Sequence, residues 1–247
     1  MKNDNRIKLT GIILGELLTV GTILFLLATK QYGRLPMAFC TLLFVLLPAI
    51  MERIFHCKLC LPVYIFALLY AVGPMMGQCW LFYYTISWWD NLLHTCGGVM
   101  FAIVGAYFFE LLTRRKDHFL AEALFALCFS MAIAALWEFA EFGADVLLGM
   151  ETQDDTMITH LTSYLLGESA GITGSIGNIQ SVIVNGVSLP GYIDIGLIDT
   201  MTDMILESLG ALITCLLYLF DRGRHPLIQD KSRTEKEKDD GKRICNL

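Results

Sequence analysis

Three carboxylates lie on one face of the last long apolar segment of the chain. Asp199, Asp203 and Glu207 are spaced four residues apart, so they stay within about 80° of one another around a helix. Burying an ionised carboxylate in hydrocarbon is costly, and ionisable side chains inside a membrane segment usually mark an ion site, a proton relay or a substrate pathway. The chemistry of this chain therefore depends on which groups these carboxylates face.

Two earlier apolar segments carry acidic residues in related patterns. Asp90 and His94 are one helical turn apart at the start of one segment. Near the end of the next segment, Glu138 and Asp145 align on one helix face, with Glu141 about 60° away. No Lys or Arg lies in the half of any apolar segment that corresponds to these acidic residues, which is the outer half in the orientation predicted below. Carboxylates crowded at low dielectric cannot all stay ionised alone, so they either share protons or bind a cation.

One histidine with several carboxylates forms a hard, oxygen-rich ligand set. Such a set suits Mg²⁺, Mn²⁺ or Ca²⁺, and Zn²⁺ if His94 takes part. The predicted metal ligands are Asp90, His94, Glu138, Glu141, Asp199 and Asp203, with Asp145 and Glu207 as a second group. Glu138, Asp203 and His94 are also the candidate catalytic residues. The structural alternative is a network of protonated acids and hydroxyl groups that holds the helices together.

Composition indicates that these residues belong to a membrane protein. The 247 residues are 55% hydrophobic and 17% charged, whereas soluble domains carry about a quarter charged residues. The apolar blocks reach the roughly 20 residues that cross a bilayer core. We therefore predict an all-α polytopic membrane protein with six transmembrane helices in residues 1–220, followed by a polar tail over residues 221–247. The predicted spans are residues 9–29, 35–54, 59–82, 90–113, 119–148 and 199–220.

The positive-inside rule predicts the orientation. With the N-terminus and the C-terminus in the cytoplasm, all Lys and Arg residues except Lys30 and Arg34 fall on the inner side. The expected location is the bacterial cytoplasmic (inner) membrane. In this orientation Glu138 lies about 15 Å below the outer end of its helix and Glu207 about 12 Å below Asp199, so their depths match.

A long external loop, residues 149–198, separates the fifth and sixth spans. It contains no Lys or Arg, and Asn185-Gly186 between β-branched residues predicts a tight hairpin. Loops of this length often act as lids or binding loops. Glu110 and Glu122 point away from the acidic faces and lie toward the cytoplasm, where we expect hydrogen bonding between helices or an interfacial position.

Three ordered motifs resemble the YjdF-like inner-membrane proteins, a bacterial family of unknown function. They are Asp90-x-x-x-His94-x-x-x-Gly98, Trp137-Glu138-x-x-Glu141 and Asp199-Thr200-x-x-Asp203-Met204 with Gly210-Ala211 further on. The first motif is also similar to VanZ-like membrane proteins. The resemblance implies a membrane location and marks the same acidic positions, but it implies no reaction.

The leading hypothesis is a metal-dependent membrane enzyme that acts on a lipid or an envelope precursor, with the external loop over its site. The expected partners are the lipid bilayer and that substrate, and no nucleic acid. One alternative is an ion or proton-coupled transporter that uses the same acids; another is a non-catalytic lipid-binding or scaffold protein. Against transport, the inner halves of the spans offer only Glu16, Glu110 and Glu122 as acids.

Overall fold

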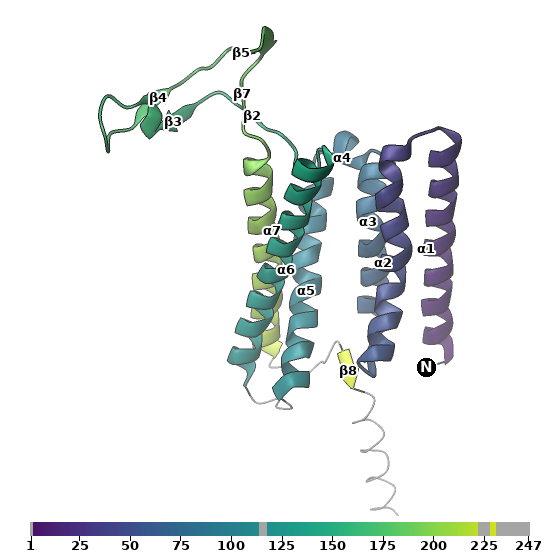
Figure 1. Ribbon diagram of the computed structural model, residues 1–247. Coiled ribbons are helices and arrows are strands. Elements are labelled where there is room, and N and C mark those ends of the chain that lie inside the picture. Colours follow the sequence, from purple (N-terminus) through teal and green to yellow (C-terminus); the bar gives the residue numbers. More distant parts are fainter. Residues whose placement is uncertain (1, 114–117, 222–227, 231–247) are drawn as a thin grey trace, which may run out of the picture. The chain divides into compact units, whose positions relative to one another are not determined.

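The structure is a computed structural model that describes residues 2–113, 118–221 and 228–230. Part of the inner-side charge count, Arg114, Arg115, Lys116 and nearly all of the polar tail, lies outside the described residues. The long helices are α1 Lys2–Ala28, α2 Leu35–Ile54, α3 Leu61–Cys79, α5 Trp89–Thr113, α6 Phe119–Leu148 and α7 Leu197–Asp221 (Figure 1). Within the described ranges, six helices are long and apolar enough to cross a membrane. The predicted all-α membrane architecture is confirmed.

The third span is shorter than predicted, and local backbone chemistry explains why. α3 begins after Cys60 and carries a proline in its first turn, where a missing N–H leaves no hydrogen bond unmade. It is followed by Leu81, which adopts a left-handed conformation with φ 65°. A short helix, α4 Phe82–Thr85, then leads into α5.

The segment between α6 and α7 folds into three small antiparallel strand pairs. β2 Met157–Ile158 pairs with β7 Tyr192–Ile193, β3 Leu161–Ser163 with β4 Gly174–Ile176, and β5 Val182–Val184 with β6 Val187–Leu189. A 3₁₀ turn, η2 Tyr164–Leu166, follows β3. The predicted hairpin is confirmed: Asn185 and Gly186 join β5 to β6 with φ values of 50° and 86°, as a type I′ turn requires.

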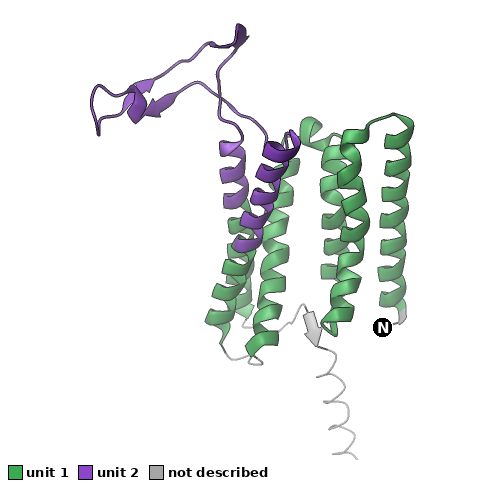
Figure 2. Cartoon of the chain, viewed as in Figure 1, with its two compact units in different colours: residues 1–131, 206–247 green, residues 132–205 purple. Residues whose placement is uncertain are grey.

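The chain divides into two compact units, residues 1–131 with 206–247 and residues 132–205 (Figure 2). The first unit contains α1 to α5, the first part of α6 and most of α7. The second unit contains the rest of α6, the strand pairs and the first turns of α7. The single six-span domain stays a prediction.

Two types of packing hold the first unit together. α1, α2 and α3 share a core of larger side chains that includes Leu26, Val45 and Met75, all fully buried. α5, α6 and α7 instead meet through small residues such as Ala102, Ala126 and Ala211. Small residues let helix backbones approach closely, and this packing matters in a membrane because no hydrophobic effect drives the helices together there. At one end of this unit, β1 Cys57–Leu59 pairs with β8 Ile228–Asp230.

Candidate metal centre

The site is built on a close crossing of α5 and α7. A Cβ atom added to Gly98 would lie 1.9 Å from the backbone oxygen of Glu207, and one added to Gly210 would lie 2.2 Å from the backbone oxygen of Thr95. Both distances are far too short for any side chain. The two backbones therefore touch at this crossing, and Gly98 and Gly210 are the residues that permit it.

His94 stands one turn before Gly98 on α5 and is held close to this crossing. The His94 side chain is 10% exposed. Its Nε2 lies 3.6 Å from an Oδ of Asp90, one turn earlier on the same helix, and the Asp90 side chain is one-third (33%) exposed. The expected stacking of Asp90 and His94 on one helix face is thus present, and it joins a buried imidazole to a partly solvated carboxylate.

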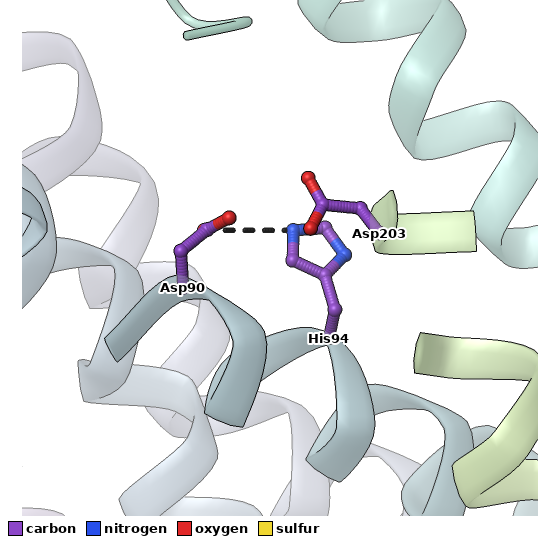
Figure 3. Close-up of side chains that lie close together, drawn as sticks. All are labelled: Asp90, His94 and Asp203. Carbon is purple, nitrogen blue, oxygen red and sulfur yellow. Dashed lines mark ion pairs between the residues drawn. The ribbon is translucent and has the colours of Figure 1, made fainter. Parts of the chain in front are cut away.

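Asp203 completes a three-residue group, which we call the Asp–His cluster: Asp90, His94 and Asp203. Asp203 lies one turn before Glu207 on α7 and is 1% exposed. One ligand atom from each residue of the cluster lies within 4.8 Å of the other two (Figure 3). Ligands of a tetrahedral zinc ion at 2.0–2.1 Å stand about 3.4 Å apart. The cluster therefore needs side-chain shifts of only about 1 Å to close around an ion.

Glu207 extends the polar face of α7 beside the cluster. Its side chain is 4% exposed. A Cβ atom added to Gly97, which follows His94 by three residues on α5, would lie 3.6 Å from the Glu207 carboxyl carbon and 2.8 Å from the Tyr70 hydroxyl. The missing side chain at Gly97 thus leaves room for a carboxyl and a phenol on the helix face that carries His94.

The other predicted ligands on α6 are in different surroundings. Glu138 is buried, with 4% exposure. Glu141 accepts a hydrogen bond of 2.9 Å from the Trp137 indole one turn earlier. Metal binding by Glu138 and Glu141 stays a prediction.

Asp145 and Asp199 hold the base of the loop between α6 and α7. Asp145 accepts hydrogen bonds from the backbone N–H and the hydroxyl of Thr152, both 2.7 Å, and from the N–H of Gln153. Asp199 accepts a bond of 2.9 Å from the N–H of Asp154. Both carboxylates sit at helix ends, where unpaired backbone N–H groups of the loop are within reach. Their predicted role as metal ligands is untested by this geometry.

A second polar feature lies at the other end of the same three helices. A cavity of about 360 Å³ between α5, α6 and α7 is lined by Glu110, Glu122, Tyr218 and Asp221 among mostly apolar residues. Glu122 is 1% exposed, and its carboxyl accepts a hydrogen bond from the Tyr218 hydroxyl. The sequence predicts that Glu110 and Glu122 lie toward the cytoplasm, but it did not predict this cavity. Their equal distance from the α5–α6 connection, three residues on either side, was a usable signal.

Comparisons with known proteins place this chain in a family. A family model described as "Predicted membrane protein (DUF2238)" matches residues 11–224. The chain belongs to this family. An uncharacterised protein of Thermotoga maritima is 34% identical over 91 residues, which cover 34% of this chain and 46% of that relative. The chain thus spans about half the length of the relative it matches.

No solved structure matches the chain. Family membership confirms a membrane protein, consistent with the bacterial inner membrane, while the finer likeness to YjdF-like proteins stays a prediction. The family description assigns no activity, so function rests on the Asp–His cluster.

Proposed function

We propose that this membrane protein binds a divalent cation at the Asp–His cluster and is an enzyme acting on a lipid or envelope precursor. The observation that carries the proposal is the approach of Asp90, His94 and Asp203 to within 4.8 Å. Two carboxylates and one imidazole from three different positions match the three-ligand sets of catalytic metal sites, which keep one coordination position open for water or substrate.

The ligand chemistry favours Zn²⁺ or Mn²⁺ over Ca²⁺ and Mg²⁺. An imidazole nitrogen suits the first pair, whereas Ca²⁺ takes six or more oxygen ligands and Mg²⁺ usually keeps several waters. When bound, such a cation polarises a carbonyl or phosphoryl oxygen and lowers the pKa of a bound water.

The chain supplies the remaining functional groups close to the cluster. Glu207 lies one turn after Asp203, and its carboxyl sits above Gly97 on the His94 face of α5. In our proposal it accepts a proton from the attacking water, and the Tyr70 hydroxyl beside Gly97 orients the substrate. The loop anchored by Asp145 and Asp199 is the expected lid.

Metal content tests the binding step. Protein purified in detergent without added chelator should contain about one Zn²⁺ or Mn²⁺ per chain by elemental mass spectrometry. His94→Ala should lose it, because a ligand is removed, while His118→Ala, at an exposed position just before α6, should keep it. Equal metal content in wild type and His94→Ala would rule out the site.

Product formation tests the reaction step. Wild-type protein reconstituted in a bacterial lipid extract should convert one lipid or lipid-linked species in a metal-dependent reaction, detected by lipid mass spectrometry. His94→Ala should be inactive and His118→Ala active. If the protein binds metal but forms no product that depends on His94, it is a metal-binding protein and the enzyme proposal is refuted.

The inner-end cavity favours one other function, proton-coupled transport. α5 carries Asp90 at its start and Glu110 near its end, about 30 Å apart at the helical rise, which is the thickness of a bilayer core. Buried Glu122 faces the cavity beside Glu110. Acids near both ends of one helix would serve as the entry and the exit of a proton path.

Flux measurements distinguish the two functions. In proteoliposomes containing a pH-sensitive dye, a transporter should acidify the lumen with a rate that falls in both Asp203→Asn and Glu122→Gln. An enzyme should be unaffected by Glu122→Gln, because this residue is at the far end from the Asp–His cluster. No dye response above that of empty vesicles would exclude proton coupling.

A further inference from the structure

The end of the first unit that carries Arg34 contains a cavity unrelated to the acidic residues. It has a volume of about 620 Å³ and lies between the last turns of α1, the turn η1 Tyr32–Arg34 and the end of α3. Its size is in the range of small-molecule and cofactor sites. In Figure 1 this is the end of α1 opposite the N-terminus.

One wall of this cavity is apolar and open. Leu17 and Phe25 line it and are 63% and 58% exposed. Gly21 lies between them on α1, and a Cβ atom added there would meet nothing within 4 Å. The glycine therefore leaves a hollow on a helix face that is otherwise covered by large aliphatic and aromatic side chains. In a bilayer such a hollow accommodates an acyl chain.

The other wall is polar and carries one positive charge. The Arg34 guanidinium lines the cavity, half-buried, and donates a hydrogen bond of 2.5 Å to Gln31 Oε1. No carboxylate of the described residues forms an ion pair with Arg34, and none lines the cavity. The guanidinium therefore has further N–H donors and a positive charge for a ligand, in a fork that matches phosphate oxygens.

Two contacts hold the polar wall in place. The Trp80 indole donates a hydrogen bond of 3.2 Å to Thr22 Oγ1, which joins the end of α3 to α1. The thiol of Cys79 donates to the backbone oxygen of Arg34 at 3.5 Å. The backbone of Arg34 is therefore tied to the end of α3, which lines the same cavity.

We propose that this cavity binds an anionic glycerophospholipid, with its phosphodiester on Arg34 and one acyl chain along Leu17, Gly21 and Phe25. A guanidinium that pairs with no carboxylate of the described residues, next to an open apolar wall, fits a ligand with one charged end and one long apolar end. A soluble anion would use only the first feature, and a neutral lipid only the second. This site is independent of the proposed function of the Asp–His cluster.

Native mass spectrometry of delipidated protein in detergent tests the proposal with phosphatidylglycerol and phosphatidylcholine as probes. Wild type should bind phosphatidylglycerol at least tenfold more tightly than phosphatidylcholine. Arg34→Gln should remove this preference. Lys30→Gln, which removes an exposed positive charge four residues earlier, should retain it. A preference unchanged in Arg34→Gln would overturn the assignment of the phosphodiester.

The apolar half is tested separately. Gly21→Leu fills the hollow without strain, so it should weaken binding of both lipids at least fivefold while leaving the melting temperature unchanged. Unaltered binding in Gly21→Leu would refute the acyl-chain position. Millimolar glycerol phosphate is the control for a headgroup-only site: in our proposal it does not displace phosphatidylglycerol, and complete displacement would overturn a lipid site.

Discussion

Replacing Asp203 by Asn should make the protein more stable than wild type without metal and less stable than wild type when metal is added. Asp203 and Asp90 place carboxylate oxygens within 4.8 Å of each other. Two unit charges at that distance repel by roughly 3 kcal/mol at an effective dielectric constant of 20. Water around Asp90, one-third (33%) exposed, reduces this to about 1–2 kcal/mol. Without metal, the neutral amide should therefore stabilise the protein.

The reversal follows from mass action. A cation present at 100 times its Kd stabilises the folded protein by about 2.7 kcal/mol, and losing one of three ligands should lower the affinity at least 100-fold. Since 1 kcal/mol shifts the melting temperature of a chain of this size by about 2–4 °C, wild type should gain roughly 5–10 °C with saturating Zn²⁺ or Mn²⁺. Asp203→Asn should melt a few degrees higher than wild type in chelator and show no such gain.

The assay is thermal unfolding in detergent, followed by intrinsic fluorescence with and without chelator. It should be run at one fixed pH for wild type and variant, so that the two proteins are compared in the same buffer. Glu122→Gln is the matched control, because this carboxyl is equally buried, at 1% exposure, and lies outside the cluster. A variant that is less stable than wild type in chelator, with an unchanged metal response, would refute the reasoning and favour a structural hydrogen-bond network.

Two further predictions concern packing and pH. Gly98→Ala should destabilise the protein by at least about 2–3 kcal/mol, because its Cβ would lie 1.9 Å from the Glu207 backbone oxygen. Gly33→Ala, where a Cβ meets nothing within 4 Å, should be nearly neutral in the same unfolding assay. Burial acts to raise the pKa of Asp194, but backbone N–H donors that include that of Thr156 outweigh it and hold the pKa below its ordinary value. The loop stability contributed by Asp194 should thus be complete above about pH 4 and fall as the pH drops through the lowered pKa. The protection factor of the Thr156 amide, which compares its exchange rate with the intrinsic rate at the same pH, should therefore fall in acid in wild type, and Asp194→Asn should remove this pH dependence.

The membrane architecture was predictable because it depends on composition and length alone. In hydrocarbon, an apolar block of about 20 residues can pair its backbone N–H and C=O groups within itself only as a helix, and the chain has six such blocks. The Asn185-Gly186 hairpin was predictable for a local reason, since few residue pairs adopt two successive positive φ values. The predicted start of the third span, residue 59, was less accurate. Apolar residues continue into β1, and hydropathy cannot reveal that a strand pairs with a distant segment.

The acidic site was predictable as a helix face but not as a ligand set. Helical periodicity places Asp199, Asp203 and Glu207 on one side of α7, and the structure brings only Asp203 of these into the Asp–His cluster. Asp199, like Asp145, lies at a helix end and is hydrogen-bonded to loop backbone. Which carboxylate meets a loop amide depends on the path of the loop, and residue spacing carries no information about that path.

The role of Gly98 and Gly210 links the packing of this protein to its chemistry. Gly210 follows Asp203 by seven residues and Glu207 by three, so the helix face of α7 that carries the acids also carries the glycine that touches α5. On α5, His94 and Gly98 are likewise one turn apart. The helix register that lets the two backbones meet is therefore the register that faces Asp203 toward His94. A bulky residue at Gly210 would push α7 away from Thr95 and open the Asp–His cluster without altering any of its ligands, so metal affinity should fall together with helix packing.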